Sequence, residues 1–128
     1  MKEIVNSAAY ADGKRIADVD IFDVSSVLKE ENQFVWIGLH EPSEEILNRV
    51  QNEFNLHELA VEDAHRAHQR PKVEQYADSI FVVLRTAQMN LDHRIDFGET
   101  HFFVGNFFIV VVRHGSNVLY SDVRTRCE

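Results

Sequence analysis

Side chains able to do acid–base or metal chemistry are concentrated in one segment, His57 to Glu74, which reads HELAVEDAHRAHQRPKVE. At about 100° per residue, a helix from Leu56 to about Ala67 carries an apolar stripe and, beside it, a polar stripe. The apolar stripe consists of Leu56, Leu59, Ala60, Ala64 and Ala67, and the polar one of Glu58, Glu62 and His65. Asp63 falls inside the apolar stripe.

A carboxylate on an apolar helix face needs a partner, because an isolated charge is costly to remove from water. One hypothesis is that Asp63 lies at the edge of the buried face, where it pairs with an arginine or caps a neighbouring helix. The other is that it binds a cation. The residues of the segment leave both open.

Histidines in the same segment suggest a second kind of metal site. Glu62-x-x-His65 matches half of a di-iron carboxylate motif, but the chain has no second copy of it. Glu62, His65 and His68 carry groups that bind zinc, so a soluble metal-dependent enzyme is an alternative function. A solvated helix face explains the same three residues.

Motifs of other catalytic chemistries are absent from the sequence, so we expect no enzyme activity and no catalytic residue. The chain has no Gly-x-Ser-x-Gly elbow, phosphate-binding loop or dinucleotide fingerprint. Asp96-Phe97-Gly98 spells a kinase triplet without the loops that accompany it in kinases.

Composition excludes several further classes. The 128 residues carry a formal net charge of −8, which disfavours nucleic acid as a partner. The longest apolar run, Phe107 to Val112, is far shorter than the ~20 residues of a membrane-spanning helix. The single cysteine, Cys127, rules out a disulfide framework, and the first residues show no secretory signal.

Alternation of strand-like and helix-like stretches predicts one α/β domain over residues 1–128, with a mixed sheet and helices on at least one face. A hairpin is expected at the start, a short helix near Val24, a central strand over Phe34 to Leu39, and a helix that begins after Pro42. The remaining predicted strands are Val73–Tyr76, Ile80–Thr86, Ile95–Val104 and Phe107–Arg113. Phe97, Phe102, Phe103, Phe107 and Phe108 are expected to pack in the core, on both faces of the sheet.

Longer stretches of the sequence resemble a known family. LHELAVED, HQRPKVE and the strand SIFVVLRT are similar to the cytoplasmic N-terminal domain of CorA-type divalent-cation transporters. The strand–helix unit FVWIGLHEPSEEILNRVQNEF and the hairpin FFVGNFFIVVVRHG extend the resemblance over residues 34–115.

This resemblance implies a three-layer α/β/α domain from a pentameric channel for Mg²⁺, in some members Co²⁺ or Ni²⁺, with a related branch that moves Zn²⁺. It also implies that Asp63, flanked by Glu62, binds regulatory Mg²⁺ against an acid on the stalk helix of a neighbouring subunit. Carboxylates from two subunits repel each other unless a cation lies between them, so ion occupancy would control subunit packing. Zn²⁺ or Co²⁺ remains an open alternative at this site.

The family's stalk helix, membrane helices and Gly-Met-Asn motif are absent from the sequence, so we expect the chain to be a fragment. The expected partners of the longer protein are its own transmembrane region and identical subunits in a homopentamer. The longer protein is expected in the inner cell membrane with this domain in the cytoplasm. His65 lies where the Mg²⁺ branch more often has an apolar residue, which leaves the zinc branch open.

Overall fold

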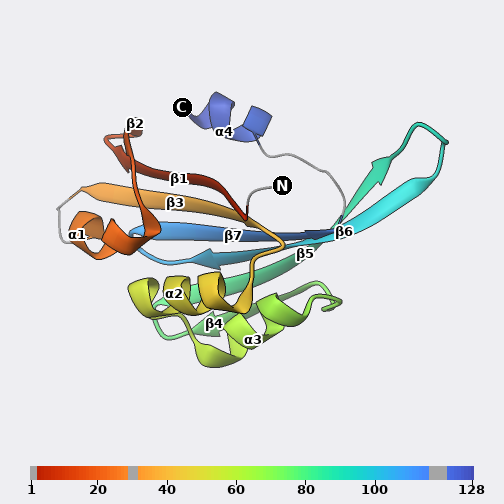
Figure 1. The fold of residues 1–128 in the computed structure, drawn as a ribbon, viewed down its shortest axis with the longest axis horizontal. Coiled ribbons are helices and arrows are strands. Elements are labelled where there is room, and N and C mark those ends of the chain that lie inside the picture. The colour runs from red at the N-terminus through yellow and green to blue at the C-terminus, as the bar shows by residue number, and fades with distance from the viewer. Residues whose placement is uncertain (1–2, 29–31, 116–120) are drawn as a thin grey trace.

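The computed structural model describes residues 3–28, 32–115 and 121–128. Within them, seven strands form one mixed sheet in the order β2-β1-β3-β7-β6-β5-β4 (Figure 1). The strands are β1 (Ile4–Ala11), β2 (Lys14–Asp18), β3 (Gln33–His40), β4 (Lys72–Tyr76), β5 (Ser79–Met89), β6 (Ile95–Val104) and β7 (Phe108–Gly115). The β3–β7 pair is parallel and the other five pairs are antiparallel.

Helices lie on both sides of this sheet. A short 3₁₀ turn, Ile21–Asp23, leads into α1 (Val24–Leu28), and α2 (Glu44–Phe54) and α3 (Glu58–Arg66) follow β3. Figure 1 shows α2 and α3 below the sheet and α4 (Ser121–Cys127) above it. The predicted α/β class with a mixed sheet is therefore confirmed, and among the described residues α4 is the element that lies on the second face.

Helix α2 begins after Pro42, as the sequence predicts, and a capping residue lies at each of its ends. The Ser43 hydroxyl accepts a hydrogen bond from the Ile46 amide at 3.3 Å, which satisfies one of the free N–H groups of the first turn. Asn55 ends the helix in the left-handed conformation, with φ of 53°, and its N–H bonds to the Gln51 carbonyl.

The main core lies between the sheet and helices α1, α2 and α3. On β3, Val35, Ile37 and Leu39 are fully buried and point toward the helices. The same face carries buried residues of β5, β6 and β7, and the apolar faces of α2 and α3 pack against them. The strand residues are Phe81, Val83, Phe103, Val110 and Val112, and the helix residues are Leu47, Val50, Ala60, Val61 and Ala64. Alternation along the strands, with a period of two, thus selects the residues of this core.

Two details of the predicted core are wrong. Leu59 is 57% exposed. The buried face of α3 is formed by Ala60, Val61 and Ala64, and Leu59 lies outside it. Phe97 and Phe107 are also exposed, whereas Phe103 is buried. Phe97 lies beyond the last β6–β7 pair, Gly98 with Gly115, on the arm of β5 and β6 that projects from the sheet in Figure 1.

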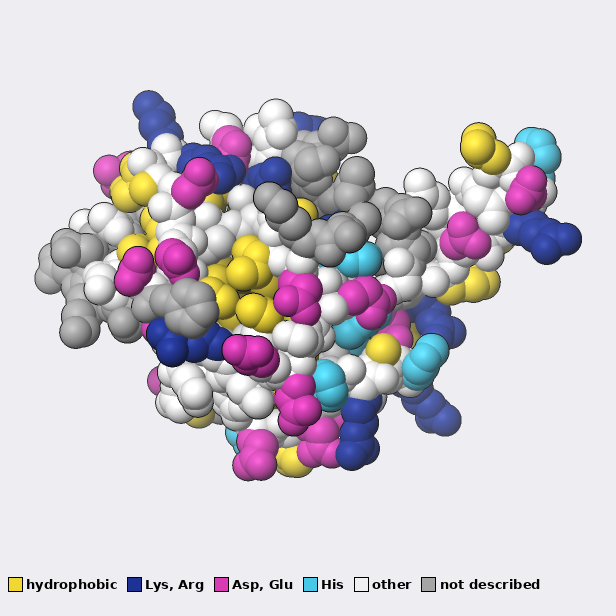
Figure 2. Space-filling model, in the orientation of Figure 1, with side chains coloured by type: hydrophobic (Ala, Val, Ile, Leu, Met, Phe, Trp, Pro, Cys, Tyr) yellow, Lys and Arg dark blue, Asp and Glu magenta, His cyan; other side chains and the backbone are white. Residues whose placement is uncertain are grey.

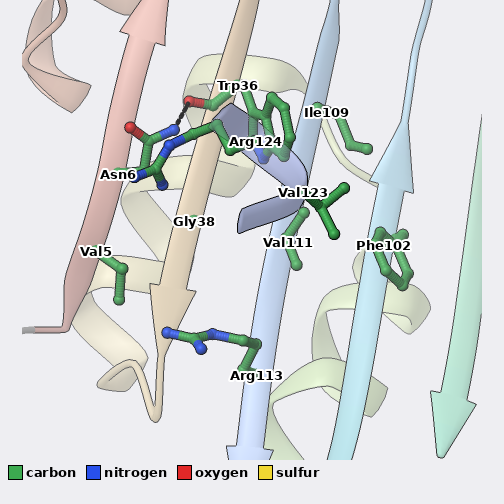
Figure 3. A pocket seen from close by; sticks show the side chains of 10 residues that line it. All are labelled: Val5, Asn6, Trp36, Gly38, Phe102, Ile109, Val111, Arg113, Val123 and Arg124. Atoms are coloured by element: carbon green, nitrogen blue, oxygen red, sulfur yellow. Dashed lines mark hydrogen bonds between the residues drawn. The ribbon is translucent and has the colours of Figure 1, made fainter. Parts of the chain in front are cut away.

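The second face of the sheet is partly open. Between it and α4 lies a cavity of about 360 Å³, with walls formed by Trp36, Phe102, Ile109 and Val111 from the sheet and by Val123 from α4 (Figure 3). These sheet residues alternate with those of the main core, so the prediction that both faces carry apolar side chains is confirmed. Among the described residues, no helix has the length and hydrophobicity needed to cross a bilayer.

Substituting Ile37, which is fully buried, should test the position of the core. We expect Ile37→Ala to lower the free energy of unfolding by about 2–5 kcal/mol, because it leaves a cavity among close-packed side chains. Ile16→Ala is the matched control, since Ile16 is 50% exposed on β2 and its loss should cost about 0.5 kcal/mol or less. Urea denaturation measures both, and equal losses in the two variants would contradict this core.

Candidate functional site

Asp63 lies at the edge of the buried face of α3, with its side chain 28% exposed. Its carboxylate accepts a hydrogen bond from the Lys72 ammonium at 2.6 Å, and that ammonium also lies 2.5 Å from the Glu74 carboxylate. The bonds to Asp63 and then to Glu74 raise the pKa of Lys72 to about 12. The hypothesis of a paired acid at the edge of the buried face therefore describes Asp63, although the partner is a lysine.

Glu62, the neighbouring candidate ligand, points further into solvent. Its side chain is 46% exposed and lies 2.9 Å from the Arg66 guanidinium, one turn along the same helix. Figure 2 shows acidic, basic and histidine side chains intermixed over the part of the surface that α3 occupies. Asp63 and Glu62 thus form a half-exposed pair of carboxylates whose charges are both balanced within the chain.

The predicted zinc triad is not assembled. Glu62, His65 and His68 are exposed, and within the described residues no three histidine, cysteine or acidic side chains are grouped so that they hold a metal. A divalent cation at Asp63 and Glu62 therefore has at most two carboxylates to bind here. Water or a residue from another chain must supply its other ligands.

The structure also brings together a set of buried polar residues that the sequence analysis did not identify. Glu99 and His101 on β6 and His114 on β7 are 6%, 0% and 8% exposed, and Glu41 follows β3. The His101 Nε2 atom lies 3.3 Å from a Glu99 oxygen, and the His114 Nδ1 atom lies 3.3 Å from a Glu41 oxygen. The available signal was the spacing Glu99-x-His101 inside a strand, which places both side chains on one buried face.

These buried residues attach the end of α3 to the sheet. The Glu99 carboxylate accepts hydrogen bonds from the amides of His68 and Gln69, just after the helix. The His114 Nε2 atom bonds to the carbonyl of Ala64 in its last turn. Burial by itself would raise the pKa of Glu99, but the bonds from the two amides and from His101 outweigh it, so the pKa lies below its usual value. Glu99 is thus a charged acceptor for the backbone.

A family model and a known protein each match most of this chain. Residues 31–128 match the model of the family described as CorA-like Mg²⁺ transporter protein. The cobalt/magnesium transport protein CorA of Thermotoga maritima is 30% identical over 111 residues, which are 81% of this chain and 31% of that protein. The chain therefore spans about a third of that relative's length.

Solved structures share the fold. The cytoplasmic domain of ZntB from Vibrio parahaemolyticus superposes with a TM-score of 0.70 at 10% identity, over 99% of this chain and 50% of that one. The soluble domain of CorA from Methanocaldococcus jannaschii gives a TM-score of 0.62 at 13% identity, over 98% of this chain and 46% of that one.

The mixed sheet with its helices is thus a fold that the chain shares with the soluble domain of CorA and the cytoplasmic domain of ZntB. More particularly, the chain belongs to the CorA-like Mg²⁺ transporter family, since the family model covers most of its length. The resemblance found in the sequence is confirmed.

Removing the lysine that pairs with Asp63 should have little effect on stability. We expect Lys72→Met to lower the free energy of unfolding by about 1 kcal/mol or less, because the pair is about one-third exposed and water screens it. Lys14→Met, on the exposed strand β2, is the control. Thermal unfolding of both variants measures the difference, and a loss several times larger for Lys72 would show that the pair is a main support of α3.

Proposed function

We propose that this chain is the cytoplasmic regulatory domain of a divalent-cation transporter that resides in the inner cell membrane. Membership of a transporter family is the observation that carries the proposal. The name of the Thermotoga relative, a cobalt/magnesium transport protein, favours Mg²⁺ and Co²⁺ as the transported ions. His65 on α3 keeps Zn²⁺ as a second candidate, since imidazole is a common zinc ligand. A chain with this role has no catalytic turnover of its own.

In this proposal, Asp63 and Glu62 supply one half of a regulatory cation site and a neighbouring subunit supplies the other. The half-exposed position of both carboxylates supports this, because it leaves each of them within reach of another chain. Mg²⁺ suits such a shared site, as it keeps several water molecules and binds through one or two carboxylates. Assembly as a homopentamer with its own transmembrane region would bring the second half into place.

Lys72 sets the strength of the proposed site. A cation at Asp63 competes with the ammonium that lies 2.6 Å away, so binding must replace an existing charge pair. At low cation concentration, Lys72 and Arg66 neutralise the two acids. When the cation concentration rises, the ion replaces Lys72 and links Asp63 to the neighbour. Cation binding would then be coupled to subunit packing.

Titration of the 128-residue chain with Mg²⁺, followed by amide NMR, tests the first half of the site. We expect roughly millimolar binding, with shifts centred on residues 62 and 63, since two carboxylates without a rigid cage bind Mg²⁺ weakly. Asp63→Asn should abolish the shifts, and Lys72→Met should strengthen binding several-fold. Glu58→Gln, an exposed acid on the same helix, is the control and should behave as the unchanged chain does.

Ion flux through a membrane-spanning protein that contains this chain tests regulation. We expect Asp63→Asn to weaken the dependence of flux on internal Mg²⁺, because the variant lacks the charge that the ion must neutralise between subunits. Glu58→Gln again serves as the control. If the curve of flux against internal Mg²⁺ is the same with Asp63→Asn, Asp63 has a structural role and the regulatory assignment fails.

A further inference from the structure

The segment after α3 has a strained backbone that one buried carboxylate holds. Ala67 and His68 both have positive φ, 57° and 58°, a region that residues with a side chain seldom adopt. Such residues cost free energy and persist where their surroundings fix them. Here the Glu99 carboxylate accepts the N–H groups of His68 and Gln69, the two residues that follow the first strained position.

The His101 ring supports that carboxylate from a fully buried position, and this burial disfavours a charge on the ring. The His101 Nε2 atom lies 3.3 Å from a Glu99 oxygen. Because a carboxylate only accepts hydrogen bonds, the neutral ring carries its proton on Nε2 and donates a hydrogen bond to Glu99. The Nδ1 atom is buried and has no hydrogen-bond partner among the residues that the structure describes. A second proton would create an N–H donor with no acceptor, on a ring that is fully buried.

His114 has different surroundings. Its two ring nitrogens face two acceptors, the Ala64 carbonyl and the Glu41 carboxylate. The two rings are 5.4 Å apart, and a charge on His114 opposes a charge on His101. Of the two rings, His101 is the one with a nitrogen that faces no acceptor among the described residues.

We propose that Glu99 and His101 form a pH-sensitive latch: neutral His101 holds Glu99 on the strained segment 67–69, and protonation of His101 under mild acid releases that segment from the sheet. A cavity of about 440 Å³ lies beside the latch, lined in part by His68, Glu99 and His114, and gives water a route to the released residues. The latch acts on the end of α3 and does not depend on a cation at Asp63.

The charged groups around His101 come from every element packed against it. Glu99 adjoins it on β6, His114 faces it from β7, and Asp63 acts on it from α3. Further out, Lys72 on β4 pairs with Asp63, Glu41 pairs with His114, and Arg85 on β5 lines the cavity. Burial is the largest influence and lowers the pKa of His101, the charge of His114 acts in the same direction, and the carboxylates act against both.

The sign of the pH effect follows from that lowered pKa. In the unfolded chain, where water reaches the ring, the ordinary pKa of histidine is about 6.5. A group whose pKa is lower in the folded state binds fewer protons there, so its contribution is complete above about pH 6.5 and decreases as the pH falls below it. The pKa values of Glu99 and Glu41 are also lowered, from 4.5, so their contributions decrease only in stronger acid.

Amide hydrogen exchange in the 128-residue chain between pH 7.5 and 5 tests the latch. After correction for intrinsic exchange rates, we expect the protection of the His68 and Gln69 amides to fall across this range, since the released state binds a proton that the folded state resists. The amides of the central strand β3 should stay protected. A flat profile at His68 and Gln69 would overturn the proposal.

Two variants and a control make the test specific. His101→Gln keeps an N–H donor toward Glu99 without a titrating group, so its profile should be flat, whereas Glu99→Gln should leave both amides poorly protected at every pH. His93→Gln, in the exposed turn between β5 and β6, should keep the profile of the unchanged chain. A folded His101→Gln variant that still loses protection in acid would refute the role of His101.

Direct titration of the His101 ring by NMR covers the case in which His101→Gln does not fold. In the unchanged chain, the ring signal and the exchange of the His68 and Gln69 amides should change over the same pH interval. A ring that gains its proton while both amides stay protected would overturn the latch. Neither measurement needs Mg²⁺, so failure of the latch and failure of the proposed cation site are distinguishable.

Discussion

Burial of one face of the sheet beneath α2 and α3 is the constraint on which the rest of the structure depends. Val35, Ile37 and Leu39 on β3 lose all contact with water only if helices cover them, and the parallel partner β7 supplies Val110 and Val112 to the same layer. The parallel pair requires a long connection between its strands, and that connection contains both helices. The position of α3, and so of Asp63, follows from this packing.

Polar residues inside that layer fix the end of α3 more specifically than apolar packing does. Ala60 and Ala64 are small and nonpolar, so contacts between the helix and the sheet tolerate small shifts along the axis. Hydrogen bonds to Glu99 and His114 do not, because each joins one backbone group to one side-chain atom. A buried polar network gives such specificity only while all its members are paired, and the unpartnered Nδ1 atom of His101 is therefore its sensitive point.

Acids on the outer side of the same helix are in a different environment. The side chains of Asp63 and Glu62 are 28% and 46% exposed, and each lies beside a cationic partner, Lys72 or Arg66. The chain spans 31% of the length of the Thermotoga relative, and both acids keep part of their surface exposed. The proposed regulation needs this arrangement, because a site fully satisfied within one subunit could not report on its neighbours.

Most of the strands and helices, the α/β class and the family could be predicted from the sequence, because strand alternation and motifs such as HQRPKVE are local features. The sequence also marked Asp63 as an acid that needs a partner. It did not predict that the partner is Lys72, that Leu59 faces solvent, or that Glu99, His101 and His114 meet at the end of α3. These contacts join residues from different strands and helices, and sheet order and helix rotation depend on the packing of the whole core, which periodicity within one segment does not specify.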